Sequence, residues 1–497
     1  MQRALLTAAT VLLALPTARA QSGTQLFRND VVHEIRLTIT EPAWAATLWA
    51  WHSNGTDNSL MATVAVDGTA LDSIGVRMRG NGTFVWASTP KKPFKLDFNY
   101  FLPDQRYDGL RSVNMNNDLF DASHIHNAVC FKMLNDFGVA APRTGYANLF
   151  INDTLYGLYS LAEQINKNFT GERFQNNDGD LWKAIYCNWQ YVGSDTNLYT
   201  SQLEPKDAYD GQAWDRLLHV FEMLGTTAFA DLDDSLDAVM EMDDFLKTYA
   251  VNAATFANDN AANNWWLYWD NDSGRYRYIP WDYDLAFFGN STYPFTEDTT
   301  QIFSWWSTTQ LAKAVIRNPD LKARYYDHLC RLRADIFTPQ HLYGFIDSAY
   351  VLLQPHALND VMDLFDGNDF DSAYFALNTD GTGEFWGVRP YIDTQGAIID
   401  SVLIAKQVNC SSIGIAEVPE QQELQLFPVP MSDRAVLVLP KGSALTSIEI
   451  RDQQGRLMRT RSVAGETFTI ERGALEPGAY SIRCVDGSMR AVRFIVL

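Results

Sequence analysis

The sequence predicts an α+β protein with a β-rich N-terminal part, a mostly helical middle part and a small all-β module at its C-terminus. Three observations lead to this fold class. Short alternating apolar runs dominate residues 21–200, and apolar residues at helical spacing dominate residues 201–410. Residues 411–497 consist of short alternating runs separated by turn signals, as in a β-sandwich. A chain of 497 residues also exceeds the roughly 100–200 residues of one domain, so we expect several.

Composition excludes disorder and makes nucleic acid an improbable partner. Hydrophobic residues make up 46% of the chain and charged residues 20%, which is enough to build a core. The formal net charge of -21 repels phosphate backbones. Residues 21–414 carry 27 basic and 50 acidic residues, a net charge of -23, whereas residues 415–497 are neutral. The acidity therefore belongs to the first two parts of the chain.

The first 20 residues have the pattern of a signal peptide. Arg3 gives a positive start, an apolar run covers Ala4–Leu15, and Ala18-Arg19-Ala20 is a cleavage signal. No other apolar run approaches the roughly 20 residues of a membrane span. We expect an exported, soluble mature chain, secreted or at the cell surface, with no transmembrane span.

Cysteine is sparse, and none of its positions form a CxxC pair. The five residues are Cys130, Cys187, Cys330, Cys410 and Cys484. Neither a disulfide framework nor a zinc site is expected, although one bridge stays open.

The N-terminal part begins with three predicted strands, at His33–Thr40, Ala62–Val66 and Gly75–Arg79. A turn at Arg77–Thr83 follows, and then a strand through Phe94, Leu96 and Phe98 that Lys91 and Lys92 precede. A glycine turn lets backbone N–H groups approach an anion, and a neighbouring lysine supplies charge. Ordinary surface is the alternative interpretation of both features.

A helix and a hairpin come next. Apolar residues at helical spacing predict a helix over Ser123–Phe137, and Gly138 would end it. Tyr146–Ile151 and Leu155–Glu163 flank Asn152-Asp153-Thr154 as a β-hairpin. Strands, a helix and a hairpin follow one another in the same order in the N-lobe of a protein kinase.

The middle part carries the densest polar constellation. Asp243 is predicted to cap a helix that runs to Phe256. The polar run Asn258–Asn264 follows, and the aromatic runs Trp265–Trp269 and Arg275–Ile279 flank a turn at Asn271–Gly274. These two runs predict a second hairpin, which would bring together the residues before and after it.

Three side chains would converge at the open end of that hairpin: Asp259, Asn264 and Asp282. Oxygen ligands of this kind suit Mg²⁺, which substrate phosphates complete. Protein kinases use the same order and spacing, an Asp, an Asn five residues later, a hairpin and a metal-binding Asp. Helix caps and turns are the alternative role of such residues.

Three blocks in this order resemble the CotH kinase family of atypical protein kinases, over roughly residues 30 to 405. They are Arg77–Thr83 with Lys91-Lys92-Pro93-Phe94, then Leu149–Glu163, then Asn258–Tyr268 with Ile279–Asp284. The resemblance implies a bilobal kinase-like fold, with an N-lobe over about 21–200 and a C-lobe over about 201–410. It also implies ATP and Mg²⁺ as cofactors and a Ser or Thr hydroxyl of a protein as acceptor.

The resemblance assigns roles residue by residue. Asp282 and Asn264 would bind Mg²⁺, Asp284 would bind a second metal or support Asp282, and Asp259 would be the general base. The residues expected to contact the nucleotide are Arg79, Gly80, Lys92, Glu163 and Lys183, with Lys91 and Lys95 as alternatives to Lys92. Two positions depart from the family: His126 stands where an Arg is usual, and Gly82 where a Ser is usual.

The C-terminal module resembles the sorting domain of the type IX secretion system of Bacteroidetes. The resemblance rests on Phe427-Pro428-Val429-Pro430, Asp452–Arg456, Leu475–Tyr480 and Arg493–Leu497. It implies the type IX machinery as a partner. An adhesive or carbohydrate-binding β-domain is the alternative.

Two other functions stay open for the middle part. A catalytically inactive kinase fold could be an extracellular matrix protein that holds a glycan or polymer on Trp265, Trp266 and Trp269. Paired carboxylates such as Asp282 and Asp284 also occur in glycosidases. For a kinase, the net charge of -23 predicts a basic acceptor, such as a serine flanked by Lys or Arg.

Overall fold

The computed structural model describes residues 21–287, 309–363, 365–376 and 387–410, and short segments of the remainder: 425–427, 431–438, 446–452, 456–463, 467–476, 478–484 and 492–496. The chain divides into two compact units, 1–410 and 411–497. The predicted signal peptide, 1–20, lies outside the described residues, and so do Pro428–Pro430 and residues 453–455 of the C-terminal motifs.

Seven strands of the first unit close into a barrel in the order β1-β2-β3-β4-β5-β7-β6. Strand β1 closes it, because it pairs antiparallel with β2 and parallel with β6. Alternating side chains, among them Ile35, Val64, Val76 and Leu96, are fully buried in its core. The strands are β1 Val32–Thr38, β2 Leu60–Val66, β3 Thr69–Met78, β4 Phe94–Asp97, β5 Ser112–Asn116, β6 Thr144–Ile151 and β7 Thr154–Glu163.

A second sheet has the order β11-β10-β8-β9. Its strands are β8 Leu181–Ala184, β9 Leu203–Asp207, β10 Trp265–Asp270 and β11 Arg275–Pro280. Both predicted hairpins are present, β6 with β7 and β10 with β11. The sequence did not predict that β8 would pair with β10, a contact between segments about 80 residues apart in the chain.

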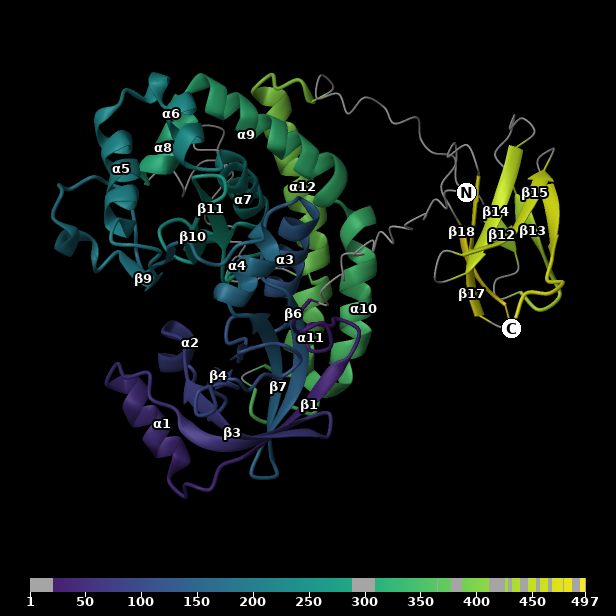
Figure 1. Ribbon diagram of the computed structural model, residues 1–497, viewed down its shortest axis with the longest axis horizontal. Helices are drawn as coiled ribbons and strands as arrows, with labels where there is room; N and C mark the ends of the chain where they lie inside the picture. The colour runs from purple at the N-terminus through teal and green to yellow at the C-terminus, as the bar shows by residue number, and fades with distance from the viewer. Residues whose placement is uncertain are drawn as a thin grey trace, which may run out of the picture. The chain divides into compact units, whose positions relative to one another are not determined.

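Helices surround both sheets (Figure 1). α3 lies between barrel strand β6 and α7, and α10 runs beside β7. The helices are α1 Trp44–Ser53, α2 Gly82–Val85, α3 His126–Asp136, α4 Lys167–Phe174, α5 Ala213–Thr226, α6 Asp233–Val239, α7 Met242–Thr255, α8 Gln310–Arg317, α9 Pro319–Arg331, α10 Pro339–Ala357, α11 Gly367–Phe375 and α12 Val388–Ala405. Short 3₁₀ turns lie at Thr196–Tyr199, Phe229–Asp231 and Asn258–Asn260, and a π-helical turn lies at Leu332–Ile336.

The predicted cap of α7 is wrong. α7 begins at Met242 after Glu241, and no side chain caps it. Asp243 instead receives hydrogen bonds from His328 and Arg324 of α9, at 3.0 and 2.9 Å. These bonds hold the pKa of the Asp243 carboxyl well below its usual range. The side chain therefore joins two helices and leaves the N–H groups of its own helix uncapped.

A buried charge network ties the segment after α10 to the barrel. The Lys91 ammonium lies 2.7 Å from Asp360 Oδ2 and 2.6 Å from Asp363 Oδ2, and all three side chains are at most 5% exposed. His124 joins Asp363 to Asp118, which Ser160 of β7 also binds. The sequence separation of 269 residues between Lys91 and Asp360 hid this pair from sequence analysis.

Gly157 of β7 makes room for this network. Its φ of +113° is one that side chains rarely adopt. A Cβ there would overlap the Asp360 carboxylate, which also accepts the Leu158 N–H at 2.8 Å. A residue with a side chain at this position would therefore push Asp360 away from β7.

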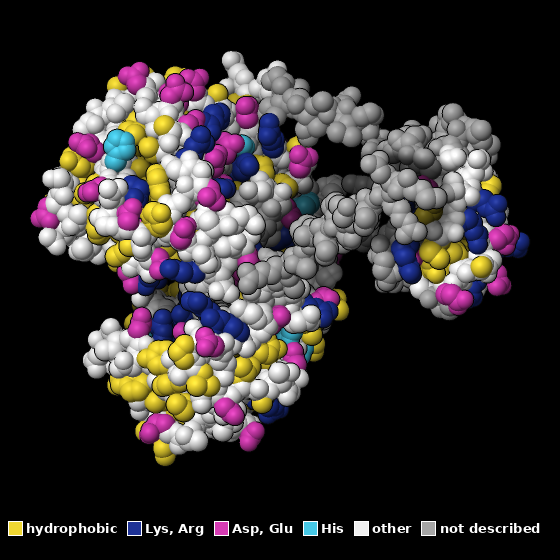
Figure 2. Space-filling model, viewed as in Figure 1, with side chains coloured by type: hydrophobic (Ala, Val, Ile, Leu, Met, Phe, Trp, Pro, Cys, Tyr) yellow, Lys and Arg dark blue, Asp and Glu magenta, His cyan; other side chains and the backbone are white. Residues whose placement is uncertain are grey.

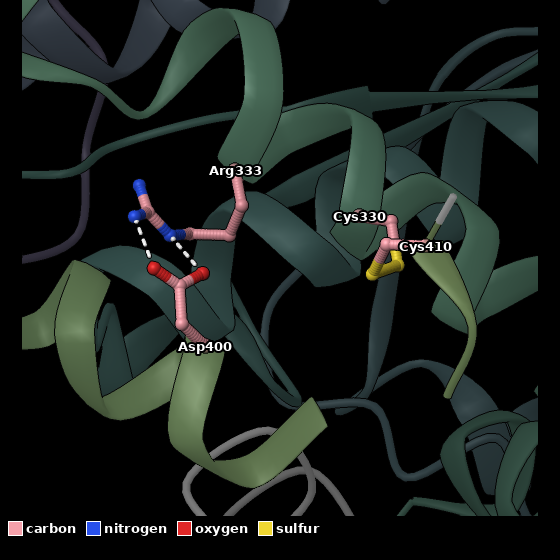
Figure 3. The surroundings of a disulfide bond; sticks show 4 residues. All are labelled: Cys330, Arg333, Asp400 and Cys410. Carbon is pink, nitrogen blue, oxygen red and sulfur yellow. Dashed lines mark hydrogen bonds and ion pairs between the residues drawn. A yellow bond between two sulfur atoms is a disulfide. The ribbon is translucent and has the colours of Figure 1, made fainter. Parts of the chain in front are cut away.

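One disulfide closes the end of the first unit (Figure 3). It joins Cys330 of α9 to Cys410, which follows α12. Beside it, the Arg333 guanidinium binds both oxygens of Asp400 at 3.0 and 2.7 Å. The stretch of chain between the two cysteines contains α10, α11 and α12, and also Asp360 and Asp363. Cys130 and Cys187 are buried free thiols.

The described residues of the second unit form two small sheets, β12-β13-β16 and β15-β14-β17-β18. A core that includes Leu437, Ile450, Ile482 and Phe494 lies between the strands. The strands are β12 Gln425–Phe427, β13 Arg434–Val438, β14 Thr446–Asp452, β15 Leu457–Val463, β16 Thr467–Glu471, β17 Gly478–Cys484 and β18 Val492–Val496.

Among the described residues, no helix combines the length and the apolar character that crossing a bilayer requires.

We expect Lys91→Met to lower the free energy of unfolding by about 3–5 kcal/mol, because it removes the ammonium that lies between the buried carboxylates of Asp360 and Asp363. Urea unfolding of the full chain measures this. Arg28→Met is the matched control, since the Arg28–Asp30 pair is 47% and 70% exposed and solvent screens such a pair. Equal losses in the two variants would contradict a structural role of the buried network.

Candidate active site

Pairing of β10 with β11 brings the polar residues around the hairpin together. The register runs from Asp270↔Arg275 to Trp265↔Pro280. Beyond the last pair, the Trp281 N–H donates to the Asn264 carbonyl at 2.9 Å, and Asn260 Nδ2 donates to the Trp281 carbonyl at 2.8 Å. Asn264 and Asp282 therefore leave the hairpin side by side, as the aromatic runs predicted.

Asp259 is held by the amides that follow it. Its two oxygens accept hydrogen bonds from Asn263 Nδ2 and Asn264 Nδ2, each at 2.8 Å. Burial raises the pKa of the Asp259 carboxyl, and the two amide donors only partly offset this. The amide nitrogen of Asn264 is directed to Asp259, which leaves the amide oxygen of Asn264 for another ligand.

Asp282 and Asp284 concentrate negative charge at the same place. Burial raises the pKa of both carboxyls, and that of Asp284 well above its usual range. Repulsion from Asp282, Asp259, Asp118 and Asp121 adds to the shift of Asp284. An excess of buried carboxylates is costly unless a cation compensates it.

Two of the predicted nucleotide contacts, Arg79 and Lys183, lie beside these carboxylates. The charges of both side chains act on Asp282. The Arg79 guanidinium lies 5.9 Å from the ring centre of Trp281, and the Lys183 ammonium lies 5.9 Å from that of Trp266. Trp266 is 4% exposed, and its indole N–H has no hydrogen-bond partner among the described residues. Two cations beside one another suit an anion.

Lys95, an alternative in the sequence analysis, belongs to the same group of cations. It pairs across the barrel strands with Arg77. The charge of Arg77 acts on both Arg79 and Lys95, and the charge of Arg79 acts on Lys95. Burial and the neighbouring Arg77 lower the pKa of Lys95 to about 8. Figure 2 shows Lys and Arg side chains gathered where the barrel meets the part of the unit that contains the second sheet.

Lys92 is not part of this group. Lys92 is only 5% exposed, and its ammonium donates to the backbone carbonyls of Phe84, at 3.0 Å, and Ala87. It also lies 4.7 Å from the ring centre of Trp49. Lys92 precedes the regular part of β4, so alternation along the strand did not decide which way its side chain points. We leave it out of the proposed nucleotide site.

Gly80 does have the conformation that a tight turn requires. Its φ is +84°, and its carbonyl accepts a hydrogen bond from His52 Nε2 at 2.7 Å. The turn therefore sets the direction in which the chain leaves Arg79.

Glu163 is occupied elsewhere. Arg143 and Arg173 bind both of its oxygens, and Arg143 also bonds the Ser22 carbonyl. The carboxylate is 3% exposed. Two cations already neutralise it, so we do not carry its predicted contact with the nucleotide forward.

The predicted aromatic binding surface is wrong for two of its three residues. Trp265 and Trp266 are 1% and 4% exposed. Trp265 stacks on Trp189, with ring centres 4.7 Å apart, and Trp266 packs against Trp281 in the core. These indoles face the interior because both faces of β10 are covered, and they offer no surface to a glycan.

His126, Asp118 and Asp121 were missed as neighbours of the site. His126 Nδ1 lies 3.0 Å from the Asp284 carbonyl oxygen, and its backbone N–H donates to Asp121 Oδ2 at 2.7 Å. His126, which stands where the resemblance led us to expect an Arg, therefore joins the start of α3 to the segment after β11. The helix period located α3, but it could not show that the first turn of α3 meets the segment after β11.

The oxygen donors of the site suit a metal ion that substrate helps to hold. No three His, Cys, Asp or Glu side chains of the described residues group closely enough to hold a metal ion by themselves. Mg²⁺ is commonly held by one or two carboxylates and completed by waters and substrate phosphates. Asp282, the Asn264 amide oxygen and the surplus charge of Asp284 fit that kind of donor set.

Comparison with known proteins gives one family match. A family model described as CotH kinase protein matches residues 76–365. Inner spore coat protein H of Bacillus subtilis (strain 168) is 21% identical over 323 residues, which cover 63% of this chain and 85% of that protein.

Two solved structures are also similar in part. The Helicobacter pylori proinflammatory kinase CtkA is 10% identical, covers 71% of this chain and 94% of its own, and has a TM-score of 0.27. PorZ, a surface component of the type IX secretion system of Porphyromonas gingivalis, is 18% identical, covers 17% of this chain and 13% of its own, and has a TM-score of 0.14. Neither TM-score is high enough to support an argument about this fold.

We expect Lys95→Met to increase the free energy of unfolding at pH 7 by on the order of 1–3 kcal/mol. Below pH 8 the lysine is charged in both the folded and the unfolded chain, so the full cost of burying the charge is present. Between about pH 8 and the ordinary value of about 10.4, the folded chain loses the proton first. Wild-type stability therefore rises with pH, and the difference from the variant narrows.

Urea unfolding at a series of pH values measures this difference. Lys167→Met is the control, because Lys167 is 46% exposed in its ion pair with Asp207. A Lys95→Met variant less stable than wild type at pH 7 would contradict the repulsion inferred among these cations.

Proposed function

Because the chain belongs to the CotH kinase protein family, we propose that it is an atypical protein kinase that transfers the γ-phosphoryl group of ATP to a Ser or Thr hydroxyl of a protein. One observation carries the proposal: the β10–β11 hairpin brings Asp259, Asn264 and Asp282 to one place beside Arg79 and Lys183. Phosphoryl transfer needs this combination of acidic and basic groups, because positioning and charge neutralisation supply most of its catalysis.

The basic residues would bind the phosphates. Arg79 lies close enough to Lys183 and Lys95 for its charge to lower the pKa of both lysines. An anion among them would remove that repulsion, so the affinity of the site for phosphate would come partly from strain already present in the folded chain.

Asp282 and Asn264 would hold Mg²⁺, with Asp284 in support, and the ion would offset negative charge on the phosphates. Asp259 would accept the proton of the acceptor hydroxyl. Its raised pKa makes it a stronger base than a solvated aspartate, and the amides of Asn263 and Asn264 fix its orientation.

Export of the chain is the second part of the proposal. The predicted signal peptide supports it, and so does the Cys330–Cys410 disulfide, since such bonds persist in oxidising compartments. We also propose that residues 411–497 are a type IX sorting domain. The resemblance of their motifs supports this, and the small sheets of the second unit are compatible with a β-sandwich.

We expect transfer of labelled phosphate from ATP, in the presence of Mg²⁺, to Ser-containing peptides. Asp282→Ala and Asp259→Asn should each lower transfer about 100-fold or more, since each removes a group that acts on the reacting atoms. Asp272→Ala is the matched control: it removes a carboxylate from the turn of the same hairpin, far from Asp282 along both strands.

Thermal unfolding with and without ATP·Mg²⁺ tests nucleotide binding apart from transfer. Saturation at about 100 times Kd should stabilise the wild type by about 2.7 kcal/mol. Absence of both stabilisation and transfer, or equal transfer by wild type and Asp282→Ala, would contradict the kinase proposal.

We expect a basic acceptor. Residues 21–414 carry a net charge of -23, and Asp259, Asp282 and Asp284 belong to the proposed site, so Lys or Arg beside the acceptor serine should speed association and lower KM. Peptides that differ only in Lys and Arg against Glu and Asp flanks measure the preference. It should weaken as salt rises; faster phosphorylation of the acidic peptides at low salt would contradict it.

A further inference from the structure

Helix α2 is unusually well held for one of four residues. It follows Gly80, whose φ of +84° sets the turn. Side chains from three other segments donate to the backbone of this turn and helix: His52 to Gly80, Asn117 to Thr83 at 3.2 Å, and Lys92 to Phe84 at 3.0 Å. Polar tethers of this kind fix the position of a short element that could not persist alone.

The outward side of α2 nevertheless exposes large apolar side chains. Val85 is 65% exposed, and Trp86, which follows the helix, is 66% exposed. The Trp86 ring meets Phe120 edge to face, with ring centres 5.8 Å apart. Trp49 of α1 is 43% exposed and lies 4.6 Å from the Phe84 ring. We name Trp49, Val85, Trp86 and Phe120 the α2 patch.

Gly82 is what allows the Trp86 ring to take this position. A Cβ at Gly82 would lie 2.6 Å from the ring, closer than real Cβ atoms approach. The ring therefore rests on the backbone of the first residue of α2. Contacts with Gly82 and with Phe120 hold the ring in place, and much of the Trp86 side chain stays exposed.

The α2 patch lies next to the candidate active site. α2 begins three residues after Arg79, and Phe120 follows Asp118 by two residues. Arg79 and Asp118 both act electrostatically on Asp282. Figure 2 shows apolar side chains over the α1 and α2 end of the barrel, beside the Lys and Arg side chains of the site. The patch and the site therefore share the two chain segments that carry Arg79 and Asp118.

Size and charge restrict what can cover the patch. Its side chains can bury on the order of a few hundred Å², below the roughly 800 Å² per partner of a stable protein interface. Beneath it, the ammonium of Lys92 is paired with carbonyl oxygens and with the rings of Trp49 and Phe84. That buried positive charge disfavours a basic side chain, so a single large apolar side chain fits the patch best.

We propose that the α2 patch binds a large apolar side chain of the acceptor polypeptide, a few residues from the hydroxyl that is phosphorylated. This inference rests on the proposed kinase function. It adds an apolar side chain to the basic residues already expected in the acceptor. The acceptor then carries basic residues toward the carboxylates and a Leu, Phe or Trp toward α2.

Peptide binding tests the proposal without requiring phosphate transfer. The probes are fluorescent peptides with a central Ala in place of the acceptor Ser, basic residues on one side, and Leu or Ala placed in turn at each flanking position. Fluorescence anisotropy with the full chain gives Kd. We expect Leu at one position to bind about tenfold more tightly than Ala, and the double variant Val85→Ser with Trp86→Ser to lose that difference.

Phe101→Ser is the matched control. Phe101 is exposed on the same barrel, but it follows the opposite end of β4 from Lys92, and the preference for Leu should persist in this variant. Stabilisation by ATP·Mg²⁺ should be the same in all three proteins. In a transfer assay with the Ser form of the preferred peptide, the double variant should raise KM about tenfold and leave kcat nearly unchanged.

Three results would overturn the proposal. One is equal binding of the Leu and Ala peptides to the wild type at every position. Another is loss of ATP·Mg²⁺ stabilisation in the double variant, which would assign Trp86 to the nucleotide. The third is a concentration-dependent dimer that the double variant abolishes, which would make a second copy the occupant. Wild type that binds the Leu peptide but transfers no phosphate would instead contradict the kinase function and leave the apolar contact established.

Discussion

The pairing of β10 with β11 is the constraint on which the candidate site depends. Residues 264 and 282 are 18 positions apart, yet the register Trp265↔Pro280 and the bond from Trp281 N–H to the Asn264 carbonyl place them together. The aromatic residues of the two strands, buried on both faces, hold that register. A shift by one residue would turn Trp266 and Trp281 out of the core and would separate the carboxylates from Arg79. The packing of indoles thus decides the geometry of the polar groups.

Like charges lie close together in the candidate site, and their repulsion lowers the stability of the folded chain. Asp282 and Asp284 repel each other, and Arg77, Arg79 and Lys95 do so across the barrel strands. A fold selected for stability alone would place apolar residues at these positions. Opposed groups of like charges, each with raised or lowered pKa, are characteristic of sites that a charged ligand completes. The Lys91 network is the contrasting case, because there the opposite charges are in contact and join two segments of the chain.

Local sequence located the candidate site residues but not the direction of every side chain. Asp259, Asn264 and Asp282 were predicted together because a hairpin is a short-range structure whose ends must meet. The sequence could not show which of Lys92 and Lys95 contacts the nucleotide, since both lie at the start of the same strand. Lys95 faces Arg77 and Arg79, whereas Lys92 donates to carbonyls behind α2. Glu163 ended a predicted strand correctly, but Arg143 and Arg173 neutralise it from segments that no local pattern connects.

By itself, the sequence determined much of the order of the elements, the two hairpins, the acidity of residues 21–414 and the candidate site residues, because periodicity, turn residues and spacing are local properties. Only the tertiary structure decided which cations accompany the carboxylates, that Trp265 and Trp266 belong to the core, that His126 meets Asp284, and that Lys91 pairs with Asp360. These are contacts between segments up to 269 residues apart. They follow from how the sheets and helices pack, and no short stretch of sequence encodes that packing.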